Sequence, residues 1–531
     1  EQWTENPRVG SSILSLGTKI MNNQSIKNQL LRALKMHQMG NIDAADEIYT
    51  EVLQNDESNF DANHLHGLVL SQKKKYSSSI KYYEKAYLIN KKNIELLNNY
   101  AISLRNIRSF EKSEDLLKEA INIDSSFIKS YLNLSNCYQS QNKLEEGLEI
   151  IQEARIKKIP ECDNLIKREI NLHLEIYNKT RKETHLKKAI SLIDFSDIES
   201  SKDIKYISLC AMAYIWSDEF HKANNLFKLT EKLSQVPPSI DLLKQTKDKN
   251  ILETFIKHEY EQLCHIDSDV DGIRNMKISQ SFFNKIKNLY EKGSINYSDD
   301  ELQTISAMHK ILYNKPIKLE ENFLNSNLDI RQIENDYNSS NPEIVVIDNF
   351  LSEKFLKEIN IFFRCANIFK RPYPRGYIGS FLNTGMSNMA ILKFSRELKY
   401  TFENIFSKYQ LSQAWAFKYD SDQKGINIHA DAAKVNVNFW ITKDESNLDT
   451  NSGGMIIWKK KPNMNASFDD FNSSHKSHKR LDEVKNIDSI KIPYRSNRAV
   501  IFNSMLYHAT DEINFKKSYI NRRVNVTLLY A

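Results

Sequence analysis

The first third of the chain repeats a pattern of side-chain sizes every 34 residues. In four successive copies, a small residue is followed four positions later by a larger one and three positions after that by a third apolar residue. The three columns are Ala45, Ser79, Ser113 and Gly147; Tyr49, Tyr83, Leu117 and Ile151; and Val52, Ala86, Ala120 and Ala154. Spacings of four and three residues place these positions on one helix face. The period therefore predicts a stacked helical array, in which neighbouring units bury the faces that no single unit can bury.

This pattern resembles the tetratricopeptide repeat, whose units are pairs of antiparallel helices. The resemblance covers residues 26–161, and a degenerate unit with Ala223, Phe227 and Thr230 in the same columns extends the repeat-like helices through 162–237. Arrays of this kind generally present a concave surface, which implies a peptide or protein partner. A helical scaffold without a ligand is the alternative interpretation.

Composition and charge narrow the remaining classes of protein. The 531 residues carry a net charge of +6, and the short lysine runs at 73–75 and 459–461 are typical of solvated faces, so we expect no nucleic-acid partner. No apolar run reaches 18 residues, which predicts no membrane span. The five cysteines show no CxxC spacing, which favours a reducing compartment and a cytoplasmic location. Residues 1–25 form an N-terminal segment that begins with Glu rather than Met, so the removal of a targeting segment stays open.

The character of the sequence changes near residue 344. Residues 238–343 combine helical and loop-like stretches, a helical connector that ends in the polar run NDYNSSNPE. The run PEIVVID then reads as a buried strand, and Ser352 is placed to cap the helix that follows it. Five further runs rich in β-branched and aromatic residues occupy 415–420, 435–441, 453–458, 498–503 and 522–530. Short strands between polar turns predict a jelly roll over 344–531, so the fold class is multidomain α + β with an N-terminal α-solenoid.

Two histidines and an aspartate in this C-terminal part match a known kind of metal site. His429 and Asp431 are two residues apart, so in extended backbone their side chains point to the same side. His508 lies near the end of RAVIFNSMLYHAT, and the apolar run before it reads as a buried strand that delivers the histidine to a strand end. Two histidines and one carboxylate on one face of an ion form the facial triad of non-haem Fe(II) oxygenases. We therefore predict that His429, Asp431 and His508 ligate iron.

The strand predicted at 522–530 supplies a cation for the same site. Arg523 and Asn525 lie on one strand face, and Arg522 lies on the other, because side chains alternate along a strand. An inward-facing arginine suits a bidentate grip on a carboxylate, with Asn525 as a neighbouring donor. Arg523 is the residue predicted to bind this carboxylate, and Arg522 is the alternative.

The motifs around these residues resemble one enzyme family. The His-x-Asp motif, SGGMIIW, NRAVIFNSMLYHAT and NRRVNVTLLY follow one another as in the double-stranded β-helix of Fe(II)/2-oxoglutarate-dependent oxygenases, over residues 344–531. The resemblance implies that the triad holds Fe(II) and that Arg523 anchors the distal carboxylate of 2-oxoglutarate. Tyr419, ten residues before His429, is expected to donate a hydrogen bond to this cosubstrate. The chain departs from the family in its doubled arginine and in Asn525, where a serine is more usual.

By this resemblance the chain is a dioxygenase that uses dioxygen and 2-oxoglutarate to hydroxylate a C–H bond. The expected substrate is a protein or peptide side chain recruited by the repeats. Asn436 and Asn438 share one face of the strand at 435–441 and would contact substrate if that face points into the barrel. Two alternatives stay open: the same chemistry on a small metabolite, with the repeats used for assembly, and a non-catalytic repeat scaffold with an inactive barrel.

Two other histidine motifs are weaker candidates for a metal site. The run HIDSDVDG at 265–272 starts like a calcium loop, but the twelfth position counted from Asp267 is Ile278 rather than Glu. A capped helix end or a polar loop is the expected structure there. His475 and His478 lie in a hydrophilic stretch that we expect to be a solvent-exposed loop.

Overall fold

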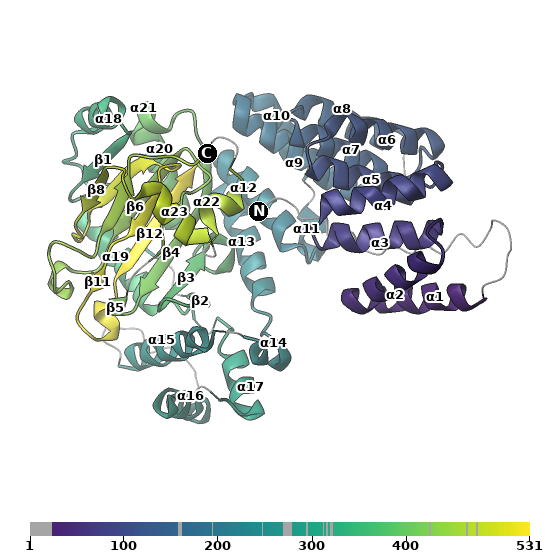
Figure 1. Ribbon diagram of the computed structural model, residues 1–531. Helices are drawn as coiled ribbons and strands as arrows, with labels where there is room; N and C mark the ends of the chain where they lie inside the picture. Colours follow the sequence, from purple (N-terminus) through teal and green to yellow (C-terminus); the bar gives the residue numbers. More distant parts are fainter. Residues whose placement is uncertain are drawn as a thin grey trace. The chain divides into compact units, whose positions relative to one another are not determined.

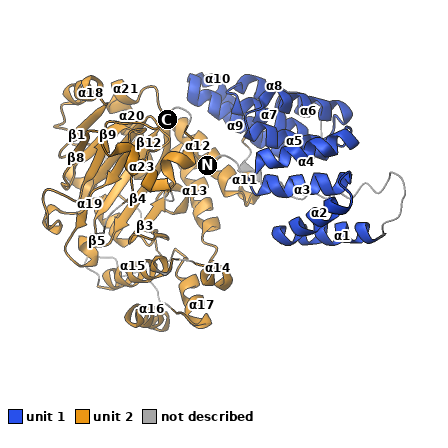
Figure 2. Cartoon of the chain, in the orientation of Figure 1, with its two compact units in different colours: residues 1–192 blue, residues 193–531 orange. Residues whose placement is uncertain are grey.

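The chain folds into two compact units, residues 1–192 (unit 1) and residues 193–531 (unit 2), shown in different colours in Figure 2. The computed structural model describes residues 24–531 except 158–161, 194, 247, 269–278, 294–295, 312, 315–316, 319–321, 424–425, 464–465 and 474–475. The division falls inside the range 162–237, which the sequence groups as repeat-like helices. Almost all of the predicted N-terminal segment 1–25 lies outside the described residues.

Unit 1 is built from helices that pack as successive antiparallel hairpins (Figure 1). Its described helices are α1 (Gln24–Gln38), α2 (Ile42–Asn55), α3 (Phe60–Gln72), α4 (Tyr76–Ile89), α5 (Ile94–Asn106), α6 (Phe110–Ile123), α7 (Ile128–Ser140), α8 (Leu144–Ile156), α9 (Cys162–Thr180) and α10 (Glu183–Leu192). The repeat columns lie on α2, α4, α6 and α8, and all twelve of their residues are buried. A small residue also lets α3 and α4 approach each other closely. A Cβ at Gly67 of α3 would lie 2.7 Å from the Tyr83 ring of α4.

Unit 2 begins with helices that continue into the β region. They are α11 (Phe195–Ser200), α12 (Ile204–Trp216), α13 (Phe220–Ser234), α14 (Ile240–Lys244), α15 (Lys249–Asp267), α16 (Gln280–Lys292), α17 (Asp299–Ala307) and α18 (Ile330–Ser339). The α12–α13 hairpin buries Ala223, Phe227 and Thr230, the residues of the degenerate repeat. The Trp216 indole donates a 2.7 Å hydrogen bond to Leu411 O, which ties this hairpin to the first residue of a strand. The repeat-like hairpin therefore belongs to the same compact unit as the strands.

The rest of unit 2 consists of antiparallel strands with helices between them. The strands are β1 (Ile344–Ile347), β2 (Arg371–Tyr373), β3 (Tyr377–Phe381), β4 (Leu411–Tyr419), β5 (Asp422–Gln423), β6 (Val435–Trp440), β7 (Met455–Trp458), β8 (Ser489–Ile492), β9 (Ala499–Asn503), β10 (His508–Thr510), β11 (Ile513–Asn514) and β12 (Val524–Tyr530). The helices are α19 (Glu353–Cys365), α20 (Met389–Thr401), α21 (Glu403–Phe406), α22 (Phe468–Asn472) and α23 (Ser477–Val484), with short 3-10 turns such as η4 (Tyr519–Asn521). Ser352 caps α19 as predicted, because its hydroxyl accepts a hydrogen bond from Phe355 N.

Among the described residues, the strands form a seven-stranded sheet in the order β1-β9-β6-β12-β4-β3-β2, a three-stranded sheet β10-β7-β8 and a two-stranded sheet β11-β5. Side chains from the large and the three-stranded sheets share one hydrophobic core, with Phe417 and Trp440 on one side and Met455, Ile457 and Ile492 on the other. Two antiparallel sheets that pack face to face around such a core are the arrangement expected of a jelly roll. The predicted fold class, with N-terminal repeats, a helical middle and C-terminal antiparallel sheets, is confirmed.

The segment before His508 differs from the prediction. The strand β9 ends at Asn503, and a turn closed by a 3.0 Å hydrogen bond from Leu506 N to Asn503 O leads into β10. His508 is thus the first residue of a new strand in the three-stranded sheet. The predicted strand run 498–503 forms β9, but this strand does not itself deliver His508, and no Gly or Pro in the sequence marks the turn that separates them.

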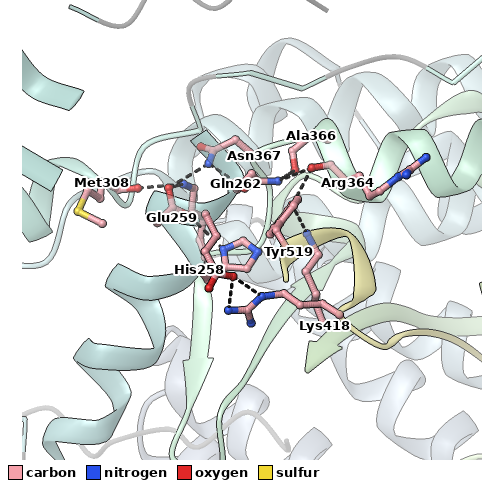
Figure 3. Close-up of polar contacts among 12 residues, drawn as sticks. His258, Glu259, Gln262, Met308, Arg364, Ala366, Asn367, Lys418 and Tyr519 are labelled. Atoms are coloured by element: carbon pink, nitrogen blue, oxygen red, sulfur yellow. Dashed lines mark hydrogen bonds and ion pairs between the residues drawn. The ribbon is translucent and has the colours of Figure 1, made fainter. Parts of the chain in front are cut away.

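Helix α15 joins the outer side of the large sheet through buried polar side chains (Figure 3). The Lys418 ammonium donates to Phe363 O at 2.8 Å and to the Tyr519 hydroxyl at 2.7 Å. Gln262 on α15 donates to Ala366 O at 2.9 Å, and the Glu259 carboxylate accepts from Asn367 at 3.0 Å. Because buried polar groups are costly unless they are hydrogen-bonded, these contacts fix α15 against the residues that follow α19, and Lys418 of β4 against α19 and η4.

His258 sits in this buried layer without a hydrogen bond, which predicts an effect of pH on stability. It is fully buried, and neither ring nitrogen has a hydrogen-bond partner among the described residues. Burial, reinforced by the charge of Lys418, holds the pKa of His258 well below its usual value. Protonation therefore favours the unfolded chain, and the free energy of unfolding should fall by up to about 1.4 kcal/mol per pH unit below about pH 6.5.

The variant His258→Phe tests this expectation, because it keeps the ring that packs beside Phe369 and Tyr519. We expect denaturant unfolding of His258→Phe to lose less stability than the wild type between pH 7 and pH 5. The exposed His221 supplies the control, since His221→Gln should leave the pH dependence unchanged. Parallel pH profiles for the wild type and His258→Phe would contradict the expectation.

Candidate metal centre

The three predicted ligands meet in unit 2. The backbones of His429 and His508 are joined by two hydrogen bonds, His429 N to His508 O at 3.0 Å and His508 N to His429 O at 2.8 Å. Asp431 N donates to Ser504 O at 3.1 Å, which holds the aspartate beside the turn before β10. One ligand atom from each of the three side chains lies within 4.8 Å of the other two, and no second group of this kind is found among the described residues.

Backbone carbonyls set the orientation of both imidazole rings. His429 Nδ1 lies 2.7 Å from Asn427 O, and His508 Nδ1 lies 2.9 Å from Leu506 O. A carbonyl oxygen only accepts hydrogen bonds, so each Nδ1 carries the proton and each Nε2 keeps a free lone pair. These Nε2 atoms lie 3.8 Å and 3.5 Å from the two carboxylate oxygens of Asp431. Two nitrogen lone pairs and a carboxylate therefore face one another.

The electrostatics of the site suit a divalent cation. Burial, with the nearby His508 ring, lowers the pKa of His429 to about 4. Burial alone would raise the pKa of Asp431, but the neighbouring imidazoles and the hydrogen bond from Asn472 hold it below its usual value. At neutral pH His429 is thus neutral and Asp431 ionised, as metal binding requires. Two imidazole nitrogens and one carboxylate oxygen fit Fe(II).

Two asparagines hold the carboxylate of Asp431. Asn436 on β6 donates to Oδ2 at 3.2 Å, and Asn472 at the end of α22 donates to Oδ1 at 3.3 Å. The amide of Asn472 also donates to Ala430 O at 2.8 Å. Sequence reasoning assigned Asn436 to the substrate and overlooked Asn472, because a single amide in a polar stretch carries no periodic signal.

Arg480 is a second residue that sequence reasoning missed. Its side chain is buried although it lies in the basic run HKSHKR. The guanidinium donates to the carbonyl oxygens of Ile428 at 2.6 Å and Asp470 at 3.0 Å, and also to that of Ser473. The neighbouring His478 is exposed as expected but lies in helix α23 rather than in a loop, and His475 lies outside the described residues.

The triad opens onto a pocket with about 410 Å³ of empty space, its mouth included. The predicted site residues that line this pocket are His429, Asp431, His508, Arg523, Asn525, Tyr419, Asn436 and Asn438. Apolar walls come from Trp415, Phe417, Ile426 and Met455. Aromatic and aliphatic walls with a few convergent polar groups are typical of sites for small organic ligands.

Arg523 is the buried cation of the pocket. Its Nε donates to Gly453 O at 2.6 Å, its Nη2 to Gly454 O at 3.2 Å and its Nη1 to the Asn525 side chain at 3.3 Å. The guanidinium also stacks at 4.9 Å over the Tyr419 ring. Residue 454 must be glycine because a Cβ there would lie 1.9 Å from the backbone oxygen of Ile492 in β8. These contacts hold the planar cation in one orientation.

Arg522 is directed to the other side of the sheet. Its Nε and Nη2 both lie 2.8 Å from Glu261 Oε2 on helix α15, and it does not appear among the residues that line the pocket. The alternation predicted along 522–530 thus separates the two arginines.

The remaining predicted residues form a polar floor of the pocket. Asn438 donates to the Thr527 hydroxyl at 2.9 Å, and the Tyr419 hydroxyl lies 3.4 Å from that of Thr510. Burial raises the pKa of Tyr419, so its hydroxyl stays protonated and can donate. The Oδ1 atom of Asn436 is buried without a hydrogen-bond partner among the described residues, which leaves an acceptor for a ligand.

One family model and several solved structures are similar to parts of this chain. Residues 60–93, a stretch one repeat long, match the family model described as Tetratricopeptide repeat, so the N-terminal helix pairs are repeats of this family. A structure titled "Functional Characterization of Pseudomonas Aeruginosa pilF" is 18% identical, with 41% of this chain and 95% of that chain covered and a TM-score of 0.33. A tetratricopeptide repeat protein from Parabacteroides merdae ATCC 43184 is 13% identical, with 40% of this chain and 80% of that chain covered and a TM-score of 0.32. YrrB, titled "a TPR protein with an unusual peptide-binding site", is 11% identical, with 35% of this chain and 91% of that chain covered and a TM-score of 0.27.

No curated protein matches the chain. The family match lies in unit 1, so the site in unit 2 is judged by its own geometry. In the part of the chain that the structure describes, no helix has both the length and the apolar character needed to cross a bilayer.

Proposed function

We propose that the chain is an Fe(II)- and 2-oxoglutarate-dependent dioxygenase that hydroxylates its substrate. The observation that carries this proposal is the convergence of His429, Asp431 and His508 in a pocket that also contains the buried guanidinium of Arg523. A facial triad alone fits several divalent cations, whereas a fixed cation beside it fits a dicarboxylate cosubstrate.

The residues of the pocket divide the work of the reaction. The Nε2 atoms of the two histidines and the carboxylate of Asp431 would hold Fe(II), which supplies the redox chemistry for converting 2-oxoglutarate and dioxygen to succinate, CO₂ and a hydroxylated product. Arg523 binds the distal carboxylate of 2-oxoglutarate, and Tyr419 donates a hydrogen bond to it. The aromatic walls exclude bulk water, which strengthens these electrostatic contacts.

The substrate that we propose is a peptide or protein side chain recruited by the repeats, because tetratricopeptide arrays typically bind such partners. The free acceptor of Asn436 and the amide of Asn438 would orient a substrate amide or hydroxyl. A small metabolite with the repeats used for assembly is the second candidate. Peptides retained by the full chain and recovered with one added oxygen atom would favour the first candidate over the second.

Turnover of 2-oxoglutarate without substrate tests the chemistry directly. We expect the purified chain with Fe(II), 2-oxoglutarate, ascorbate and dioxygen to form succinate slowly, and EDTA to stop the reaction, because uncoupled decarboxylation needs the metal, 2-oxoglutarate, dioxygen and two electrons from ascorbate, but no substrate. Succinate is measured by mass spectrometry. A chain that binds Fe(II) and 2-oxoglutarate but forms no succinate would instead be the non-catalytic scaffold.

We further infer a cytoplasmic location. The thiols of Cys137 and Cys264 form no disulfide within the described residues. Free thiols persist in reducing compartments, which supports this inference.

A further inference from the structure

A short helical segment beside the metal centre is bonded directly to the loop that carries two of the ligands. This rim segment comprises α22 (Phe468–Asn472) and α23 (Ser477–Val484). Ala430 N donates to Phe471 O at 3.0 Å, and the Asn472 amide returns a 2.8 Å hydrogen bond to Ala430 O. The rim segment therefore pairs with the residue that lies between His429 and Asp431.

The carboxylate of Asp431 receives one amide hydrogen bond on each oxygen, and the two donors come from different elements. Asn436 belongs to β6, inside the seven-stranded sheet, and Asn472 belongs to the rim segment. With both oxygens held, the carboxylate cannot rotate about its Cβ–Cγ bond. Its remaining lone pairs stay directed toward the Nε2 atoms of the two histidines.

We propose that Asn472 is a positioning residue for Asp431 and that the rim segment thereby sets the geometry of the metal ligands. The inference rests on the proposed function, since it assigns the orientation of one ligand in that site. Without Asn472, only the donor on β6 would hold the carboxylate, which could then turn away from the histidines. Metal binding would then have to fix the orientation of the Asp431 carboxylate, which lowers the affinity for the metal. Such a loss is common when a hydrogen-bond partner of a metal ligand is removed.

Arg480 fixes the rim segment in the position that this role requires. Its buried guanidinium bonds to Ile428 O in the ligand loop and to Asp470 O and Ser473 O in and beside α22. The planar guanidinium of Arg480 thus joins the ligand loop to α22, the same two segments that the side chain of Asn472 connects. The side chain of Asn472 is presented to Asp431 by this cation rather than by the sheet.

Metal affinity tests the proposal independently of turnover. Mn(II) is titrated into the full-length, metal-free chain, and free Mn(II) is followed by its EPR signal. Asn472→Ala should weaken Mn(II) binding by about 10- to 100-fold, the usual effect of removing a partner of a metal ligand. Asn486→Ala is the matched control, because this asparagine is exposed in the turn after α23. Thermal unfolding of the metal-free variants shows whether the fold is kept.

Each outcome decides between the alternatives. Weaker binding by Asn472→Ala, with an unfolding temperature close to that of the control, supports the positioning role, and equal affinities of the two variants overturn it. If Asn472→Ala unfolds early, Asn472→Leu fills the same space without a donor, and wild-type affinity in that variant also overturns the role. A wild-type chain that binds no Mn(II) and forms no succinate would overturn the proposed function instead.

Discussion

The variant His508→Ala is expected to lose Fe(II)-dependent succinate formation, to below about 0.1% of the wild-type rate. The two remaining ligands, His429 and Asp431, lie on one short loop. His508 is the ligand that strand β10 contributes, and the substitution removes it. A facial triad needs three ligands, so the two that remain would bind the metal ion too weakly to prevent its dissociation. Succinate formation and Mn(II) binding should therefore disappear together.

Controls for this variant come from the same unit. His478→Ala removes an exposed imidazole from α23 and should leave both measurements unchanged. His429→Ala should be as inactive as His508→Ala, and the double variant should be no worse, because the ligands act as one group. Helical circular dichroism should remain that of the wild type. Turnover near the wild-type rate in both single variants would exclude the facial triad.

The variant Arg523→Gln should raise the apparent KM for 2-oxoglutarate by about 100-fold, with a smaller change in kcat. A charge-assisted hydrogen bond contributes about 1.5–3 kcal/mol, and the upper end of this range corresponds to about two orders of magnitude in affinity. Gln keeps a donor but neither the charge nor the fork that now bonds to Gly453 O and Gly454 O. Arg523→Lys, which keeps the charge alone, should fall between the wild type and Arg523→Gln.

Arg522→Gln is the matched control for the anchor. It breaks the contact with Glu261 on α15 and should lower the unfolding temperature of unit 2 without changing the KM for 2-oxoglutarate. Steady-state kinetics with 2-oxoglutarate as the varied reactant separate the two cases. A raised KM for Arg522→Gln together with an unchanged KM for Arg523→Gln would reverse the assignment.

Local patterns account for the features that sequence analysis predicted well. The repeat columns were readable because each unit buries its helix face against its neighbours in the chain, so the constraint recurs every 34 residues. The two faces of 522–530 were readable because side chains alternate along any strand. Both patterns depend on the nearest structural neighbours and leave a period in the sequence.

Features that depend on single contacts between distant segments left no such period. The turn at 504–507 separates β9 from β10 within one apolar run, and no glycine or proline marks it. Asn472 and Arg480 sit in a stretch that reads as a solvated polar run, yet both side chains bond to the ligand loop. Each makes its contact only because the rim segment folds back onto residues 428–431.

Sequence analysis was enough to predict the repeats, the class of the C-terminal sheets and the three candidate ligands, since helix and strand periods, the short His-x-Asp spacing and the order of the motifs can be read along the chain. Contacts between distant segments were needed to show that Arg523 rather than Arg522 lines the pocket and that Asn436 and Asn472 hold Asp431. The physical reason is that a strand pattern distinguishes two faces without saying which one is inward. The inward face is chosen by the packing of the second sheet and of α15 on opposite sides of the strand.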